Sequence, residues 1–213
     1  MGREVMPMEP VERPEATIPT SIAQYILTPY LEFSLRFGGK DKKLLDCACG
    51  NMYQKPILDD RFEEVFYVDK IFPELFADTY QIDLETEKLP WIDNYFDVVF
   101  SFETIEHLTP ERQLLFVEEL TRVGKSVIIG SVSSDGPNYI GEHIVYKSAM
   151  RMNPYHKREF RADEWKDFFD ANFLYTEKFF PYYYHLVLGE SGFEIKSGLD
   201  PKNGISNYVV LQR

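Results

Sequence analysis

The sequence has few cysteines and no long hydrophobic run. Its two cysteines, Cys47 and Cys49, stand one residue apart on an expected strand, where neighbouring positions alternate between faces, so we expect no disulfide between them. Without a second pair they make no cysteine-rich zinc site, and we expect a reducing, cytoplasmic setting. No apolar run reaches the roughly 18 residues needed to span a bilayer. Residues 1–19 are charged and proline-rich, unlike a secretory signal.

Basic residues are also scarce. Lysine and arginine number 23 against 35 acidic residues, which gives a net charge of −12. A protein that binds a phosphate backbone needs a basic patch, and the one short run, Lys40, Lys42 and Lys43, is expected to be a solvated turn. We therefore expect no nucleic-acid substrate, and a sugar or another small molecule as the ligand.

The chain lacks the three glycines of a dinucleotide site. The segment Leu44–Asn51 is typical of a buried strand that ends near Asp46 and enters a tight turn containing Gly50. In the pattern G-x-G-x-x-G, Ala48 occupies the first glycine position and Gly50 is the one glycine of the turn, so a pyrophosphate cradle is poorly supported; Met52 replaces a further glycine of the turn. This argues against an NAD-linked oxidoreductase or epimerase. A ligand with a sulfonium group and an amino acid arm carries no phosphate, so it needs a less close approach to the backbone of the turn.

Further strand-like segments follow at regular intervals. Val65–Asp69 ends in an acid 23 residues after Asp46, and a second acid, Asp83, lies in Gln81–Leu84. Two more apolar segments follow, and the first of them runs through a Glu-His-Leu turn into an expected helix; they are Tyr95–Leu108 and Ser126–Gly130. Strands that alternate with helices predict a parallel sheet. A helix is also expected over Ser21–Phe37, kinked or split at Pro29.

In this order the segments resemble the motifs of class I S-adenosylmethionine-dependent methyltransferases. The resemblance implies an α/β fold with a Rossmann-like, seven-stranded, mostly parallel sheet and an antiparallel last strand. It implies S-adenosylmethionine as the cofactor. It also implies a set of cofactor-binding residues: the turn Asp46, Cys47, Ala48, Cys49 and Gly50, then Asp69 and Lys70 at the ribose, Asp83 and Leu84 at the adenine, and Ser101, Phe102 and His107 lining the site.

Histidines are the candidate catalytic residues. Methyl transfer from a sulfonium is an in-line displacement, and an alcohol acceptor needs a base to take its proton. His156 is the leading candidate because Asn153–Phe160 resembles a segment of methyltransferases of surface-glycan and sugar assembly; His143, in the loop after the fifth strand, is second. The tyrosines that cluster in the C-terminal part of the sequence could also stack on a sugar ring. The sequence predicts no metal site, because the candidate acids are expected to be solvated surface residues; these are Asp135, Asp163 and Asp167.

The chain divides into two parts. Residues 1–18 carry several prolines and glutamates and are expected to be a flexible leader or linker, which could join a glycosyltransferase; residues 19–213 form a single methyltransferase domain. The resulting hypothesis is O-methylation of a sugar or glycan hydroxyl. Two alternatives stay open: N- or O-methylation of another small metabolite, and a degenerate subunit that binds the cofactor without catalysis, as Met52 suggests.

Overall fold

The computed structural model of the chain describes residues 20–71, 79–136, 138–140, 143–145, 155–173 and 179–213. The expected leader, residues 1–18, lies outside them. None of the described helices is both long and apolar enough to cross a membrane. The elements are α1 (Thr20–Phe37), β1 (Gly39–Cys47), α2 (Lys55–Arg61), β2 (Phe62–Asp69), β3 (Thr79–Gln81), β4 (Phe96–Phe102), the 3-10 turn η1 (Ile105–His107), α3 (Pro110–Val123), β5 (Gly124–Val132), β6 (Asn138–Ile140), β7 (His143–Val145), α4 (Ala162–Phe173), β8 (Phe180–Gly189), β9 (Gly192–Ser197) and β10 (Ser206–Gln212).

The main sheet has the order β3-β2-β1-β4-β5-β10-β8-β9. Strands β1 to β5 pair in parallel, and β10 runs antiparallel to β5, so the expected fold class is confirmed. The sheet contains eight strands instead of the expected seven. The additional strand is β9, which returns along β8 through a tight turn closed by the Gly189–Gly192 pair, where Gly192 has a φ of 129°.

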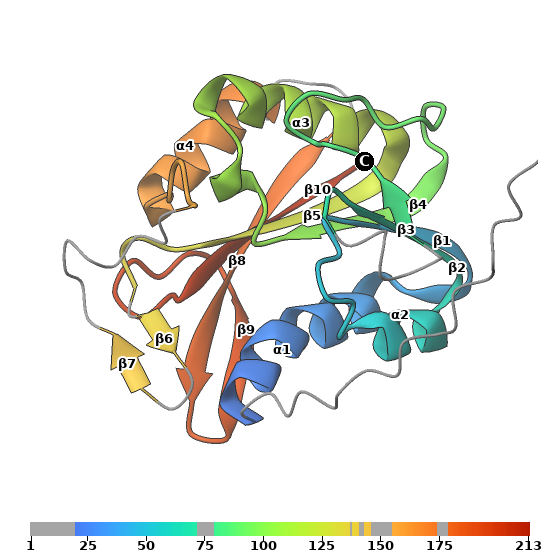
Figure 1. Cartoon of the computed structure of the whole chain (residues 1–213). Helices are drawn as coiled ribbons and strands as arrows, with labels where there is room; N and C mark the ends of the chain where they lie inside the picture. Colours follow the sequence, from blue (N-terminus) through green and yellow to red (C-terminus); the bar gives the residue numbers. More distant parts are fainter. Residues whose placement is uncertain (1–19, 72–78, 137, 141–142, 146–154, 174–178) are drawn as a thin grey trace, which may run out of the picture.

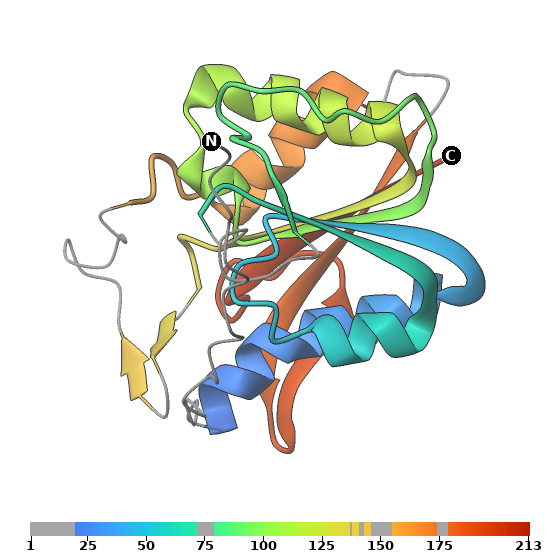
Figure 2. The same cartoon turned by 45° about the vertical axis from the view of Figure 1, so that its right-hand side comes forward.

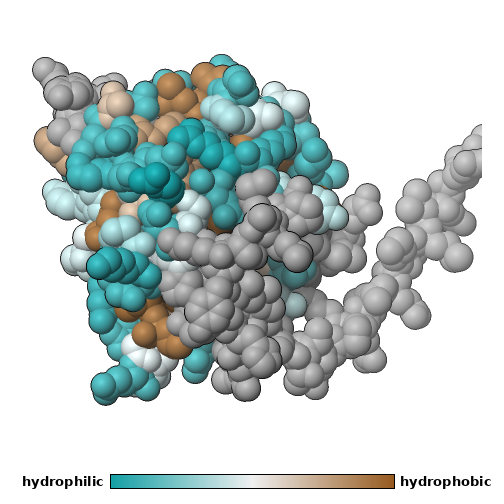
Figure 3. Space-filling model, turned by 90° about the vertical axis from the view of Figure 1, so that its left-hand side faces the viewer, coloured by the Kyte–Doolittle hydropathy of each residue, from teal (hydrophilic) through white to brown (hydrophobic). Residues whose placement is uncertain are grey.

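Helices cover both faces of the sheet. Figures 1 and 2 show α1 and α2 on one face, with α3 and α4 on the other. The core follows this division: Phe33 and Leu58 belong to the cluster beneath α1 and α2, whereas Phe116 and Trp165 belong to the cluster beneath α3 and α4. Pro29 lies inside α1 and does not split that helix in two. In Figure 3, the described residues of one side of the molecule are mostly hydrophilic, with hydrophobic residues in scattered patches.

The sheet reverses its strand order between β1 and β4. These two strands are neighbours, and the chain continues outward from them in opposite directions, to β2 and β3 and to β5. In open α/β sheets, ligands bind at the carboxyl ends of the strands beside such a switch point. The turn after β1 and the segment after β4 therefore define the region in which a site is expected.

Candidate functional site

The turn after β1 is built from residues in the left-handed backbone region. Ala48, Gly50 and Met52 have φ values of 67°, 54° and 56°. A left-handed conformation costs a residue with a side chain roughly 1–2 kcal/mol, so Ala48 and Met52 are strained at the two positions where the motif usually has glycine. The amides of Ala48 and Cys49 both donate to the carbonyl of Val68, at 2.8 and 3.0 Å, and so fasten the turn to β2.

The acids at the ends of β2 and β3 lie beside this turn. Asp69 is 8% exposed; its Oδ2 accepts from the amide of Gly50 at 3.0 Å and its Oδ1 from that of Ile71 at 2.8 Å. Lys70 pairs with Asp83 at 2.7 Å and lowers the pKa of that carboxyl. Leu84, which follows Asp83, is buried. The structure thus brings the residues expected at the ribose and the adenine to one edge of the sheet.

Asp46 is completely buried beneath the turn. Its carboxylate accepts from Gln54 Nε2 at 2.5 Å and from the Tyr30 hydroxyl at 3.3 Å. Burial raises its pKa to about 7, against the lowering effect of these two hydrogen bonds. Gln54 also donates to the carbonyl of Cys49 at 2.8 Å. Asp46 therefore acts on the site through Tyr30 and Gln54. The buried Cys47 next to it likewise lies behind the turn.

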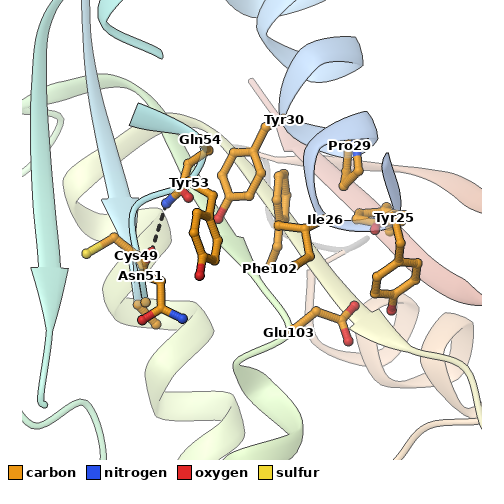
Figure 4. A pocket seen from close by; sticks show the side chains of 13 residues that line it. Tyr25, Ile26, Pro29, Tyr30, Cys49, Asn51, Tyr53, Gln54, Phe102 and Glu103 are labelled. Carbon is orange, nitrogen blue, oxygen red and sulfur yellow. Dashed lines mark hydrogen bonds between the residues drawn. The ribbon is translucent and has the colours of Figure 1, made fainter. Parts of the chain in front are cut away.

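A cavity of about 240 Å³ opens between α1, the turn and the end of β4 (Figure 4). In Figure 4, Tyr25 and Glu103 lie at one end of this cavity, and Cys49 and Asn51 lie at the other. Its lining includes four of the residues expected at the cofactor, whereas Ser101 is buried behind it; the four are Ala48, Cys49, Gly50 and Phe102. Because ligand pockets commonly hold roughly 300–1,000 Å³, this cavity suits one part of a cofactor that extends over the turn toward Asp69.

A compact cluster of three potential metal ligands follows β4. One ligand atom each of Glu106, His107 and His156 lies within 4.8 Å of the other two. The two imidazole rings stand edge to face, with their centroids 4.6 Å apart. His156 Nδ1 contacts Glu159 Oε1 at 2.6 Å, and His107 Nδ1 contacts the carbonyl of Tyr155 at 3.2 Å. Since acceptors on Nδ1 hold the proton there, the lone pair of each ring is on Nε2, as in histidines that bind metals.

Glu106 is a buried carboxylate without a partner. It is completely buried, and neither of its oxygens has a hydrogen-bond partner among the described residues. Desolvation raises its pKa, and the negative charge of Glu103 raises it further. An isolated buried charge is costly unless it is paired or coordinates a metal. Burial thus favours the neutral form of Glu106, and a cation bound beside the two histidines would favour its ionised form.

Glu103 lies close enough to the cluster of potential metal ligands for its charge to act on Glu106. Its backbone is left-handed, with a φ of 53°, and its amide donates to the carbonyl of Gly130 at 2.9 Å. Its side chain lines the cavity, and its Oε1 accepts from Ser206 Oγ at 3.2 Å. Desolvation raises its pKa, whereas the hydrogen bond from Ser206 lowers it. The carboxylate of Glu106 and the imidazoles of His107 and His156 form an oxygen and nitrogen ligand set that suits a divalent cation such as Mn²⁺ or Fe²⁺.

This cluster was not predicted from the sequence. His107 was expected at the cofactor and His156 in proton transfer, and other acids were considered as metal ligands. The structure places those acids in other contacts: Asp163 with Arg161, and Asp135 with the amide of Ala162. The sequence feature that could have indicated the cluster is the spacing Glu103-x-x-Glu106-His107 directly after a buried strand. His143 begins β7, and the described part of the structure does not place its side chain.

Three comparisons bear on the identity of the chain. Residues 45–127 match the model of a family described as methyltransferase domain. No curated protein matches the chain. A solved S-adenosylmethionine-dependent methyltransferase from Thermotoga maritima, described as a possible histamine N-methyltransferase, is similar with 15% identity and a TM-score of 0.60, covering 90% of each chain.

Two further solved structures are similar. An S-adenosylmethionine-dependent methyltransferase from Archaeoglobus fulgidus has 15% identity and a TM-score of 0.64, covering 89% of this chain and 94% of that one. The small RNA methyltransferase HEN1 has 17% identity and a TM-score of 0.62, covering 97% of this chain and 28% of that one. At these identities the structures show a shared fold. The chain thus has the fold of S-adenosylmethionine-dependent methyltransferases, and its segment from β1 to β5 matches a methyltransferase domain.

Proposed function

We propose that this methyltransferase transfers the methyl group of S-adenosylmethionine to a hydroxyl of a sugar, with the aid of a divalent cation held by Glu106, His107 and His156. The observation that carries the proposal is the buried, unpartnered carboxylate of Glu106 beside two oriented histidines. Glu103 links this cluster to the cavity at the turn after β1, where the cofactor's methionine end would lie.

The chemistry of the cluster favours a hydroxyl acceptor. A neutral amine can attack a sulfonium methyl group without assistance, whereas an alcohol must lose its proton as the new bond forms. A divalent cation lowers the pKa of a bound hydroxyl. In the proposed reaction the acceptor oxygen bonds to the methyl carbon, the bond between that carbon and sulfur breaks, S-adenosylhomocysteine leaves, and the proton passes to water.

The proposal changes the role of His156. The sequence analysis proposed it as the general base. Its Nδ1 already contacts Glu159, and its remaining nitrogen belongs to the cluster with Glu106 and His107, which fits a ligand better. His143 stays a second candidate for a base. Asp69 and Asp83 keep their proposed places at the cofactor, since they lie at or just beyond the carboxyl ends of two adjacent strands, whereas the buried Asp46 acts through Tyr30 and Gln54.

A sugar is the proposed acceptor for two reasons. The segment that contains His156 resembles a segment of sugar and glycan methyltransferases, and Tyr155, next to His156, is exposed and could stack on a sugar ring. The second candidate is the ribose of an RNA end, supported by the fold similarity to a small RNA methyltransferase. The net charge of −12 opposes it, and the absence of a nucleic-acid substrate stays a prediction.

An acceptor screen tests the proposal. The protein is incubated with S-adenosylmethionine labelled in its methyl group and with Mn²⁺ or Mg²⁺, in the presence of oligosaccharides, nucleotide sugars, amines, or an RNA oligonucleotide with a free 3′ end. Mass spectrometry should find the labelled methyl group on a sugar oxygen, in a reaction that EDTA abolishes and Glu106→Gln slows strongly. Transfer to an amine, or turnover that is unchanged by EDTA, would contradict the proposal.

A further inference from the structure

Two residues distant in sequence form a hydrogen-bonded chain that ends on Glu103. The hydroxyl of Tyr25, on α1, lies 2.9 Å from Ser206 Oγ, and Ser206 Oγ lies 3.2 Å from Glu103 Oε1. Tyr25 and Ser206 are 181 positions apart, and Ser206 follows Glu103 by 103. A side chain at the candidate site is thus held by the first described helix and the last strand.

The direction of this chain follows from the number of protons. Ser206 Oγ donates its single hydroxyl proton to Glu103 Oε1. Ser206 Oγ can then only accept from Tyr25, whose hydroxyl must donate. The three groups therefore form a polarised series of hydrogen bonds from Tyr25 through Ser206 to Glu103.

Strands and packed side chains hold each of the three hydrogen-bonded residues in place. Ser206 is completely buried at the first position of β10, between β5 and β8. The ring of Tyr25 packs edge-on against Phe193 of β9, with centroids 5.7 Å apart. The left-handed backbone of Glu103 is fixed by the bond of its amide to Gly130. In Figure 4, Tyr25 and Glu103 face each other at the end of the cavity.

We infer that Glu103, which neighbours Glu106, is a further ligand of the proposed cation, and that Tyr25 and Ser206 are positioning residues that hold its Oε1 so that its other oxygen can reach the cluster. The inference rests on the proposed function, since it requires that the cluster binds a cation. Hydrogen-bonded partners of metal ligands fix the orientation of those ligands, and removing such a partner commonly costs roughly 10–100-fold in affinity. Tyr25 also lines the cavity, so the same series of hydrogen bonds links α1 to Glu103.

The test measures the affinity of the purified full chain for Mn²⁺ by electron paramagnetic resonance, without cofactor or acceptor. Ser206→Ala should weaken Mn²⁺ binding by roughly 10–100-fold, and Tyr25→Phe, which keeps the ring, by a smaller factor. Because Tyr25 acts through Ser206, the double variant should bind no more weakly than Ser206→Ala alone. Ser206→Thr, which keeps the hydroxyl, should restore binding. Tyr182→Phe removes an exposed hydroxyl on β8 and should change nothing.

Three results would overturn the inference. If Ser206→Ala and Tyr25→Phe bind Mn²⁺ like the parent chain, with unchanged circular dichroism, the positioning role is wrong while the proposed function stands. If the two single effects add in the double variant, Tyr25 does not act through Ser206. If the parent chain binds S-adenosylmethionine but no Mn²⁺, the proposed function fails, and this inference fails with it.

Discussion

Asp46→Asn tests the electrostatics beneath the cofactor turn. Asparagine has nearly the shape of aspartate, and its amide can still accept from Gln54 through its oxygen and donate to the Tyr30 hydroxyl through its nitrogen. The substitution therefore removes the charge of a completely buried carboxyl while both neighbours keep a partner. Any change in stability that depends on pH then reports the ionisation of Asp46 itself.

The magnitude follows from the pKa. Burial raises the pKa of Asp46 from 3.8 to about 7, which corresponds to a penalty of roughly 4 kcal/mol on the ionised form in the folded protein. Since the pKa is raised, the penalty is absent below pH 3.8, grows as the pH rises, and is complete above pH 7. Between pH 5 and pH 8 the contribution of Asp46 to the free energy of unfolding should fall by roughly 2–3 kcal/mol.

Urea unfolding at several pH values from 5 to 8, without cofactor, measures this effect. The free energy of unfolding of Asp46→Asn, relative to the parent chain, should rise across that range by the stated amount. Asp97→Asn is a matched control: Lys125 lowers the pKa of Asp97, so its ionisation is complete throughout the range and its contribution should stay constant. Parallel curves for Asp46→Asn and the parent chain would refute the reasoning.

Three further predictions concern the cofactor, the cation and the turn. Asp69→Ala should weaken S-adenosylmethionine binding in calorimetry, by roughly 1–3 kcal/mol for each ribose hydrogen bond lost, and unchanged affinity would move the ribose elsewhere. Glu106→Gln should weaken Mn²⁺ binding at least about tenfold, because it removes a buried anionic ligand, and equal affinity would place the cation outside the cluster. Ala48→Gly should raise the free energy of unfolding by up to about 1 kcal/mol, since glycine relieves the left-handed strain at a φ of 67° but adds freedom to the unfolded chain. A clear loss of stability in Ala48→Gly would show that the strain at this position is not relieved by glycine.

The parallel half of the fold could be predicted from the sequence because each of its signals is local. Buried strands ending in Asp46 and Asp69, and the turn at Gly50, lie within single short segments, and the structure places them at one edge of the sheet. The positions expected for glycine but held by Ala48 and Met52 are also the left-handed positions of the turn. Here the backbone requirement is visible in the residue pattern.

The cation cluster could not be predicted in the same way, because it is assembled by tertiary contacts. His156 lies 50 positions after Glu106, and only the contact of its segment with η1 brings the two together, through the amides of residues 157 and 158 bonded to the Glu106 carbonyl. The same holds for Tyr25 and Ser206, whose meeting on Glu103 depends on α1 and β10. Strand β9 is different, because its pairing with β8 through a two-residue turn flanked by Gly189 and Gly192 is a local signal that was overlooked.

The most direct test of the account measures the distance between the cation and the methyl group to be transferred. If the acceptor oxygen lies roughly 2.1 Å from the cation and about 3 Å from the methyl carbon, that carbon lies within about 5 Å of the cation. S-adenosylmethionine with a ¹³C-labelled methyl group is bound to the protein, and Mn²⁺ is added, with Mg²⁺ as the diamagnetic control. The account predicts that Mn²⁺ broadens the methyl resonance beyond detection in the parent chain but not in Glu106→Gln. A sharp methyl resonance in the parent chain at saturating Mn²⁺ would contradict it.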